Sequence, residues 1–178
     1  MIVAVLAGGR GRRLGGAKAL ATFSGEPLIK RPLAAARAAG LDAVVVAKPD
    51  TALPDLPVLV EPAEPTHPLV GVVAALEHHG ALVAVACDQP WVTPELLRAL
   101  AEHDGPAIAV ADEPFPGRYE PSQLPVLRAA LAEEASLRRT LAQLAPAVLG
   151  APAALVRSLN TPEELAAAER ALDEAARP

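Results

Sequence analysis

The chain has 178 residues, of which 52% are apolar and only 2% aromatic, and its formal net charge is −5 with one cysteine. This length suggests a single domain, residues 1–178, with a core built mainly of Leu, Val and Ala. The excess of acidic residues argues against nucleic-acid binding. No apolar run approaches the length of about 18 residues that a membrane span needs. A lone cysteine excludes an internal disulfide. We therefore expect a soluble, cytoplasmic protein.

Short β-branched runs alternate along the chain with Ala/Leu-rich stretches of helical spacing. The runs predict buried strands at 2–6, 43–47, 58–60, 82–86 and 107–110. The other stretches predict helices at about 28–39, 70–79, 94–103, 123–144 and 162–175, two of which begin with the capping signal Thr-Pro-Glu. Strands that alternate with helices predict an α/β fold with a mostly parallel, doubly wound sheet. A polar, Pro-rich loop at 112–122 is expected to edge the site.

A glycine-rich, strongly basic segment follows the first predicted strand directly. It reads LAGGRGRRLGGAK, from Leu6 to Lys18. In a doubly wound sheet this position lies at the carboxyl ends of the strands, where ligands bind. Glycines allow a close backbone approach and successive N–H groups cradle anions, while Arg10, Arg12, Arg13 and Lys18 add positive charge. The combination suits a polyphosphate.

Two common phosphate-binding motifs do not fit this segment. The Walker A motif has its spacing between Gly11 and Gly16, but Ala17 stands at the lysine position and no hydroxyl residue follows Lys18. The dinucleotide motif begins at Gly9 but meets Leu14 where it requires glycine. A basic surface loop without a ligand remains the alternative.

Asp88 is the second candidate, because it closely follows the predicted strand 82–86. Its carboxylate would lie at the same sheet edge as the glycine segment and could hold Mg²⁺ against phosphate oxygens. An N-cap or turn aspartate is the alternative. Phosphoryl transfer needs positioning and charge neutralisation rather than a protein nucleophile, which agrees with the absence of an evident Ser-His-Asp or Cys-His set. Cys87 is expected to be a small buried residue at the strand end.

The glycine segment resembles the signature L-A-[GA]-G-x-[GS]-x-R-[ML]-G-x-x-K of nucleotidyltransferases. Four further stretches resemble motifs of the molybdenum cofactor guanylyltransferase (MobA) family, namely SGEPLI (24–29), HPLVGVVAAL (67–76), CDQPWV (87–92) and LNTPEEL (159–165). The resemblance spans nearly the whole chain. It implies a Rossmann-like three-layer fold and Mg²⁺-dependent transfer of GMP from GTP to the phosphate of molybdenum-carrying molybdopterin, with release of pyrophosphate. It also suggests transient contact with cofactor-delivery or molybdoenzyme partners.

The resemblance also implies the site residues. It gives catalytic roles to Lys18, Arg13 and Asp88, with Asp88 as the metal ligand. The nucleotide-binding residues that it implies are Leu6, Ala7, Gly8, Gly9, Arg10, Lys18, Glu61 and Asp88, and the further candidates are Gly71 and Asn160. The backbone at residues 6–8 would bond guanine, and the missing Cβ of Gly8 would let the purine lie close to the strand end. His67, where the family commonly has glycine, is expected to line the cleft.

The chain departs from the family near the expected base site. Ala47 stands where some members have asparagine, and Glu61 stands near the family's aspartate. One alternative is a related cytidylyltransferase or sugar-phosphate nucleotidyltransferase, although a cytidine enzyme is expected to have alanine at the position of Gly8. The second alternative is a non-catalytic nucleotide-binding module.

Overall fold

The computed structural model describes residues 1–9, 18–51, 53 and 56–175. The strands of the main sheet are β1 (Ile2–Leu6), β4 (Asp42–Ala47), β5 (Val58–Val60), β6 (Leu82–Ala86), β7 (Ala107–Ile108), β8 (Gly117–Tyr119) and β9 (Ala147–Val148). A separate hairpin is formed by β2 (Thr22–Phe23) and β3 (Glu26–Pro27). The helices are α1 (Lys30–Ala38), α2 (Leu69–His79), α3 (Pro94–Glu102), α4 (Leu124–Ala132), α5 (Leu137–Leu144) and α6 (Pro162–Ala175). Short 3-10 helices are formed by Lys18–Leu20, Pro121–Gln123 and Ala153–Val156.

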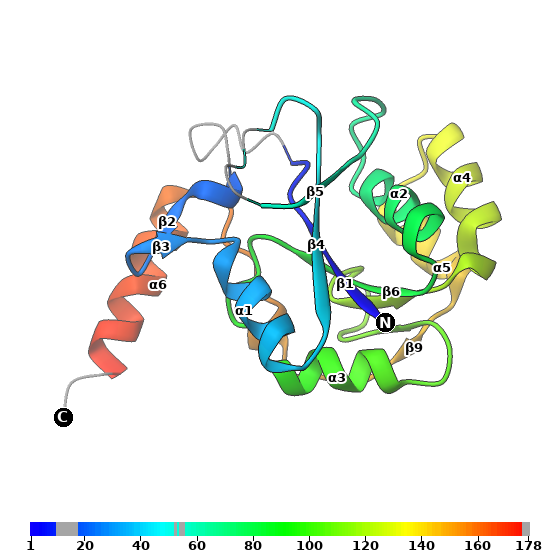
Figure 1. Ribbon diagram of the computed structural model, residues 1–178. Coiled ribbons are helices and arrows are strands. Elements are labelled where there is room, and N and C mark those ends of the chain that lie inside the picture. Colours follow the sequence, from blue (N-terminus) through cyan, green and yellow to red (C-terminus); the bar gives the residue numbers. More distant parts are fainter. Residues whose placement is uncertain (10–17, 52, 54–55, 176–178) are drawn as a thin grey trace.

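The sheet is mostly parallel, with the strand order β5-β4-β1-β6-β8-β7-β9 (Figure 1). The first four strands in this order pair in parallel, and β1 lies between β4 and β6. The strand β8 runs antiparallel to both of its neighbours, and β7 pairs in parallel with β9. The carboxyl ends of β1, β4, β5 and β6 therefore meet along one edge, as the sequence predicts for the ligand site.

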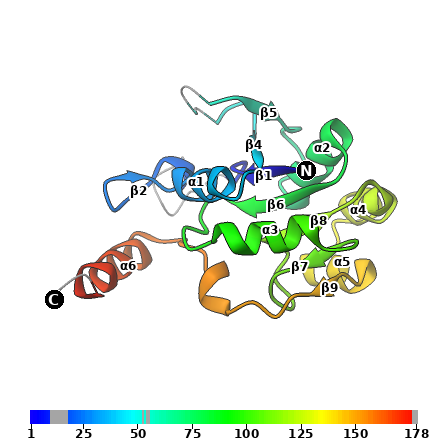
Figure 2. The ribbon, with the colours of Figure 1, turned by 60° about the horizontal axis from the view of Figure 1, so that its bottom comes forward.

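Helices cover both faces of the sheet, which gives the predicted three layers (Figures 1 and 2). Side chains alternate along β1, so Val3 and Val5 pack in the core beneath α1 and α3, while Ala4 packs in the core beneath α2 and α4. Both cores are apolar, which explains why the central strands are continuous apolar runs rather than alternating ones. None of the helices in the described ranges has the length and apolar character needed to cross a membrane.

A third, smaller core joins the two ends of the chain beside the sheet. Phe23 and Leu28, near the hairpin, pack against Leu159 and Leu165 at the start of α6. The hairpin and α6 accordingly lie side by side at one flank of the molecule (Figure 1). The backbone N–H of Ser24 in the hairpin turn donates to Glu169 Oε1 of α6 at 2.7 Å.

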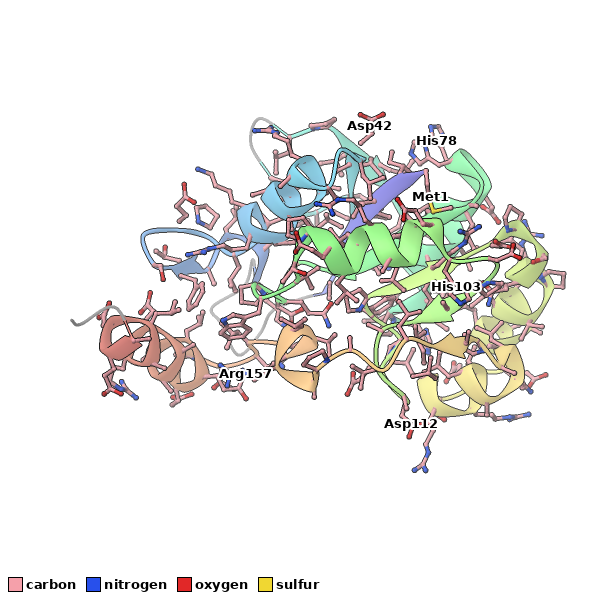
Figure 3. All side chains as sticks on the ribbon, turned by 90° about the horizontal axis from the view of Figure 1, so that it is seen from below. Met1, Asp42, His78, His103, Asp112 and Arg157 are labelled. Carbon is pink, nitrogen blue, oxygen red and sulfur yellow. The ribbon has the colours of Figure 1, made fainter. Side chains whose placement is uncertain are left out.

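The predicted segments are largely confirmed, with three corrections. The expected helix 123–144 is two helices, because Glu134 adopts a positive φ of 51° and the side chain of Ser136 caps the second helix by accepting from Arg139 N–H. The expected strand 107–110 ends at Ile108. The expected loop 112–122 contains β8, although Asp112 at its start does lie at an exposed turn (Figure 3).

Candidate active site

Backbone hydrogen bonds carry the strand pairing past the ends of the strands and so place the site residues. The N–H of Cys87 donates to the carbonyl of Leu6 at 3.1 Å, next to the end of β1. The N–H of Glu61 donates to the carbonyl of Ala47 at 2.9 Å, where β5 meets β4. The residues that follow each strand are thus held in register at the same edge of the sheet.

One end of this edge holds a cluster of Lys18, Asp88 and Asn160, here called the phosphate-end cluster. Lys18 Nζ forms an ion pair with Asp88 Oδ2 and donates to Asn160 Oδ1 at 2.6 Å. The Asp88 side chain is only 6% exposed. The N–H of Leu159 donates to the carbonyl of Asp88 at 2.9 Å, which brings the start of α6 to the end of β6. Residues far apart in sequence therefore direct two oxygen atoms at one cation.

Gln89 anchors the turn that carries Asp88. Its Oε1 accepts from the N–H of Ala86 at 3.1 Å. Its Nε2 donates to the carbonyls of Phe115 and Val156, both at 2.8 Å. Because Gln89 is buried and its amide bonds three backbone groups, it holds the end of β6 against the segments before β8 and α6.

The opposite end of the edge holds a buried pair of charges, Lys48 and Glu61. Lys48 Nζ lies 3.4 Å from Glu61 Oε1, and the two side chains are 7% and 6% exposed. A Cβ on Gly8 would lie 1.9 Å from Glu61 Oε1, and one on Gly71 would lie 2.6 Å from Glu61 Oε2. The carboxylate therefore occupies the space that the two glycines leave. Burial raises the pKa of Glu61 above its ordinary value, while the charge of Lys48 and its hydrogen bond oppose that shift.

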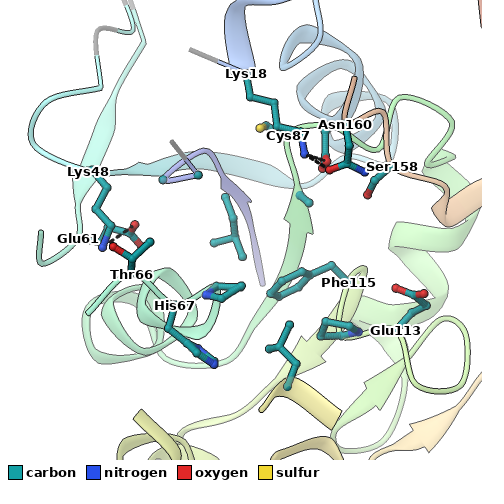
Figure 4. A pocket seen from close by; sticks show the side chains of 18 residues that line it. Lys18, Lys48, Glu61, Thr66, His67, Cys87, Glu113, Phe115, Ser158 and Asn160 are labelled. Atoms are coloured by element: carbon teal, nitrogen blue, oxygen red, sulfur yellow. Dashed lines mark hydrogen bonds and ion pairs between the residues drawn. The ribbon is translucent and has the colours of Figure 1, made fainter. Parts of the chain in front are cut away.

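A cavity of about 430 Å³ connects the phosphate-end cluster with the buried pair (Figure 4). The two groups lie on different sides of it, and His67 and Phe115 line a further wall. His67 Nε2 lies 3.2 Å from the carbonyl of Ala135, and its Nδ1 accepts from the N–H of Leu69, so its ring is held in place. The cavity thus has a lysine paired with a carboxylate at each end and a partly apolar wall between the two ends.

Most of the predicted site residues meet at this cavity. Those that line it are Leu6, Gly8, Gly9, Lys18, Glu61, Asp88 and Asn160, as well as His67. Ala7 does not, because its side chain is in the core and its N–H donates to the carbonyl of Val46 at 2.7 Å. Gly71 lies behind Glu61 rather than on the cavity wall. Arg10 and Arg13 lie outside the described residues, so their roles stay predictions.

The structure changes the reason for glycine at position 8. The sequence suggested that the missing Cβ lets a purine approach, but that space is filled by the carboxylate of Glu61. The structure also adds Lys48 and Gln89 to the residues of the site, and neither of them has a role predicted from the sequence alone. Lys48 had a signal, since it is one of only three lysines among 16 basic residues. Cys87 is buried as expected, and burial raises the pKa of its thiol to about 12.

The fold and the site together define a class of protein. The sheet is mostly parallel, and glycines after β1 and a carboxylate after β6 lie on the two sides of one cavity. This is the arrangement of a nucleotidyltransferase domain. More specifically, the chain belongs to the family described as MobA-like NTP transferase domain, which matches residues 3–169.

Individual relatives agree with this family. A molybdenum cofactor guanylyltransferase of Ectopseudomonas mendocina is 33% identical over 189 aligned positions, covering 96% of this chain and 92% of the relative. One of Pseudomonas putida is 40% identical over a shorter stretch, 55% of each chain. The crystal structure of molybdopterin-guanine dinucleotide biosynthesis protein A from Archaeoglobus fulgidus is 26% identical, with a TM-score of 0.78, and the match covers 98% of this chain and 100% of that one.

Proposed function

We propose that the chain is a molybdenum cofactor guanylyltransferase, which transfers GMP from GTP to the phosphate of molybdenum-carrying molybdopterin and releases pyrophosphate. The observation that carries the proposal is the meeting of Lys18, Asp88 and Asn160 at one end of a cavity at the carboxyl edge of the sheet. Such an end can neutralise a triphosphate, and the cavity extends from it toward groups that can read a base. Membership of the family and relatives of that activity support the proposal.

The phosphate-end cluster fits Mg²⁺. Asp88 and Asn160 offer a carboxylate and an amide oxygen, the hard donors that Mg²⁺ takes, and both already point at one cation, the ammonium of Lys18. Within the described residues, no three His, Cys, Asp or Glu side chains form a group that could hold a metal alone. Two protein oxygens completed by phosphates and water are typical of Mg²⁺ sites, where the bound ion supplies charge neutralisation for phosphoryl transfer.

Lys18 supplies the protein's own cation to the reaction. In the transfer, an oxygen of the acceptor phosphate forms a bond to the α-phosphorus of GTP, and the bond from that phosphorus to the bridging oxygen of the leaving pyrophosphate breaks. Negative charge accumulates on the leaving group, and the ammonium of Lys18 can neutralise part of it. The acceptor phosphate is already ionised near pH 7, so no side chain has to remove a proton from the nucleophile. Orientation and charge are therefore the protein's contributions.

The test is pyrophosphate release by the purified protein with Mg²⁺ and molybdenum-carrying molybdopterin, using GTP, CTP or ATP as donor. We expect release with GTP and about 10²-fold less with CTP or ATP, because a site built to pair one base edge rejects another that leaves its polar groups unpaired. Equal use of CTP would move the assignment to the cytidylyltransferases. Binding of GTP without any release would favour the non-catalytic alternative.

A further inference from the structure

Lys48 is a buried lysine whose ammonium is fully used. Its Nζ donates to the carbonyls of Pro62 and Pro65 at 2.5 and 3.3 Å and lies 3.4 Å from Glu61 Oε1. An ammonium has three hydrogens to donate, so these three partners match its capacity. The lysine follows β4, and its partners lie in the segment that follows β5. It therefore ties two neighbouring strand ends together at the wall of the cavity.

Stability alone is a poor reason for this arrangement. Removing an ammonium and a carboxylate from water is costly, and an apolar pair of similar volume is often at least as stable. Lys48 and Glu61 are also both on the cavity wall, at the opposite end from the proposed phosphate site. A buried charged pair that faces a ligand cavity is better explained by what it presents to the ligand.

Glu61 is held on three sides. The backbone at Gly8 and Gly71 approaches its two carboxylate oxygens so closely that neither position has room for a Cβ, and Lys48 holds the remaining side. A carboxylate in its ionised form only accepts hydrogen bonds. Guanine presents two adjacent donors, the N1–H and the 2-amino group, and a carboxylate with two oxygens is complementary to them.

We propose that Lys48 is a specificity-determining positioning residue, which holds the carboxylate of Glu61 at the Gly8 end of the cavity so that the site prefers a purine that carries a 2-amino group. This inference rests on the proposed function, because it concerns the nucleotide of the same reaction. Lys48 itself does not contact the base; it acts through Glu61. Burial raises the pKa of Glu61, and the charge and hydrogen bond of Lys48 oppose that rise, so Lys48 favours the ionised carboxylate that it also holds in place.

The experiment compares GTP with ITP, which differs from GTP only by lacking the 2-amino group. Equilibrium binding of each nucleotide is measured with Mg²⁺ for the wild type, Lys48→Met and Lys30→Met. We expect the wild type to bind GTP at least about tenfold more tightly than ITP, since a hydrogen bond to a charged group is involved. In Lys48→Met the ratio of the GTP affinity to the ITP affinity falls close to one, mainly because GTP binding weakens. Lys30 lies on α1 with a side chain that is 57% exposed, so Lys30→Met is the matched control and keeps the wild-type ratio.

A double-variant cycle distinguishes positioning from general damage. Glu61→Gln also lowers the GTP-to-ITP ratio, and adding Lys48→Met to it lowers the ratio no further, because residues that act through each other are not additive. Thermal melting checks folding, and Lys48→Gln replaces Lys48→Met if the latter does not fold, since a glutamine amide retains donors for the carbonyls.

Each outcome decides between the two proposals. A folded Lys48 variant with the wild-type ratio, or a wild type that does not prefer GTP over ITP, overturns the role of Lys48. A wild type that binds GTP selectively but transfers no GMP to molybdopterin refutes the proposed function and leaves the role of Lys48 standing. A wild type that binds neither nucleotide overturns both.

Discussion

Gly8→Ala is the most informative single change at the Glu61 end of the cavity. The added Cβ would lie 1.9 Å from Glu61 Oε1, whereas non-bonded heavy atoms in contact lie about 3.5 to 4 Å apart. The carboxylate must therefore move by well over an ångström. The Lys48 Nζ to Glu61 Oε1 distance is already 3.4 Å, so this movement breaks the contact that holds the carboxylate.

Losing a positioned charged acceptor costs about 1.5 to 3 kcal/mol of binding free energy, which corresponds to a dissociation constant for GTP raised about 10- to 150-fold. Equilibrium titration of GTP with Mg²⁺ measures this change, and urea unfolding shows whether the variant keeps its fold. We expect the KM for GTP to rise much more than kcat falls, because the phosphate-end cluster at the other side of the cavity is untouched.

A second substitution tests whether Gly8→Ala acts by displacing the carboxylate of Glu61. Glu61→Asp shortens the side chain by one methylene and withdraws the carboxylate from the new Cβ. Gly8→Ala combined with Glu61→Asp should therefore bind GTP more tightly than Gly8→Ala alone. If the double variant binds no better, the alanine acts by crowding the purine directly and the reasoning through Glu61 is wrong.

Four further results are expected. Lys18→Ala stays folded and loses about 10²- to 10³-fold in kcat for pyrophosphate release, as when a preorganised charge is removed; wild-type turnover would contradict its placement. Asp88→Asn keeps the shape of the side chain but loses its charge, so the Mg²⁺ concentration needed for half-maximal release rises steeply; an unchanged Mg²⁺ dependence would exclude it as the ligand. Cys87 stays a neutral thiol at pH 8, since burial raises its pKa to about 12, and iodoacetamide should label it only in denaturant; rapid labelling of the native protein would contradict its burial. Gln89→Leu leaves three backbone groups without partners, two of whose hydrogen bonds are buried, and should lower the free energy of unfolding by about 3 kcal/mol in urea titrations. A change near zero would mean that water replaces the amide.

The central strands were predictable because their residues leave little choice. Ile2–Leu6 and Leu82–Ala86 have the predicted bounds, since continuous β-branched and apolar runs suit strands buried on both faces. The edge strand Val58–Val60 also has its predicted bounds, although its residues are only partly buried or exposed. The break between α4 and α5 was not predicted, because residues 133–136 contain neither glycine nor proline. There a glutamate takes the positive φ that ends one helix, and only Ser136 marks the start of the next.

The phosphate-end cluster was easier to predict than the pair of Lys48 and Glu61. Asp88 follows a strand closely, so its place at the sheet edge depends only on the order of parallel strands. The meeting of Lys48 with Glu61 depends instead on the register of β4 against β5, where Ala47 pairs with Val60. The sequence around the two residues has no helical or strand periodicity that indicates this register, so their contact could be seen only in the structure.

The small core beside the sheet has a consequence for the timing of synthesis. Lys18 and Asn160 are 142 positions apart, and the hairpin contact of Ser24 with Glu169 spans 145 positions. A ribosome adds about 5 to 20 residues per second, so Lys18 waits on the order of ten seconds before its amide partner emerges. Within that interval β4 and β6 emerge and can pair with β1, whereas the phosphate-end cluster is still incomplete. A nascent or truncated chain that stops before Asn160 should therefore form much of the sheet and yet hold triphosphate poorly.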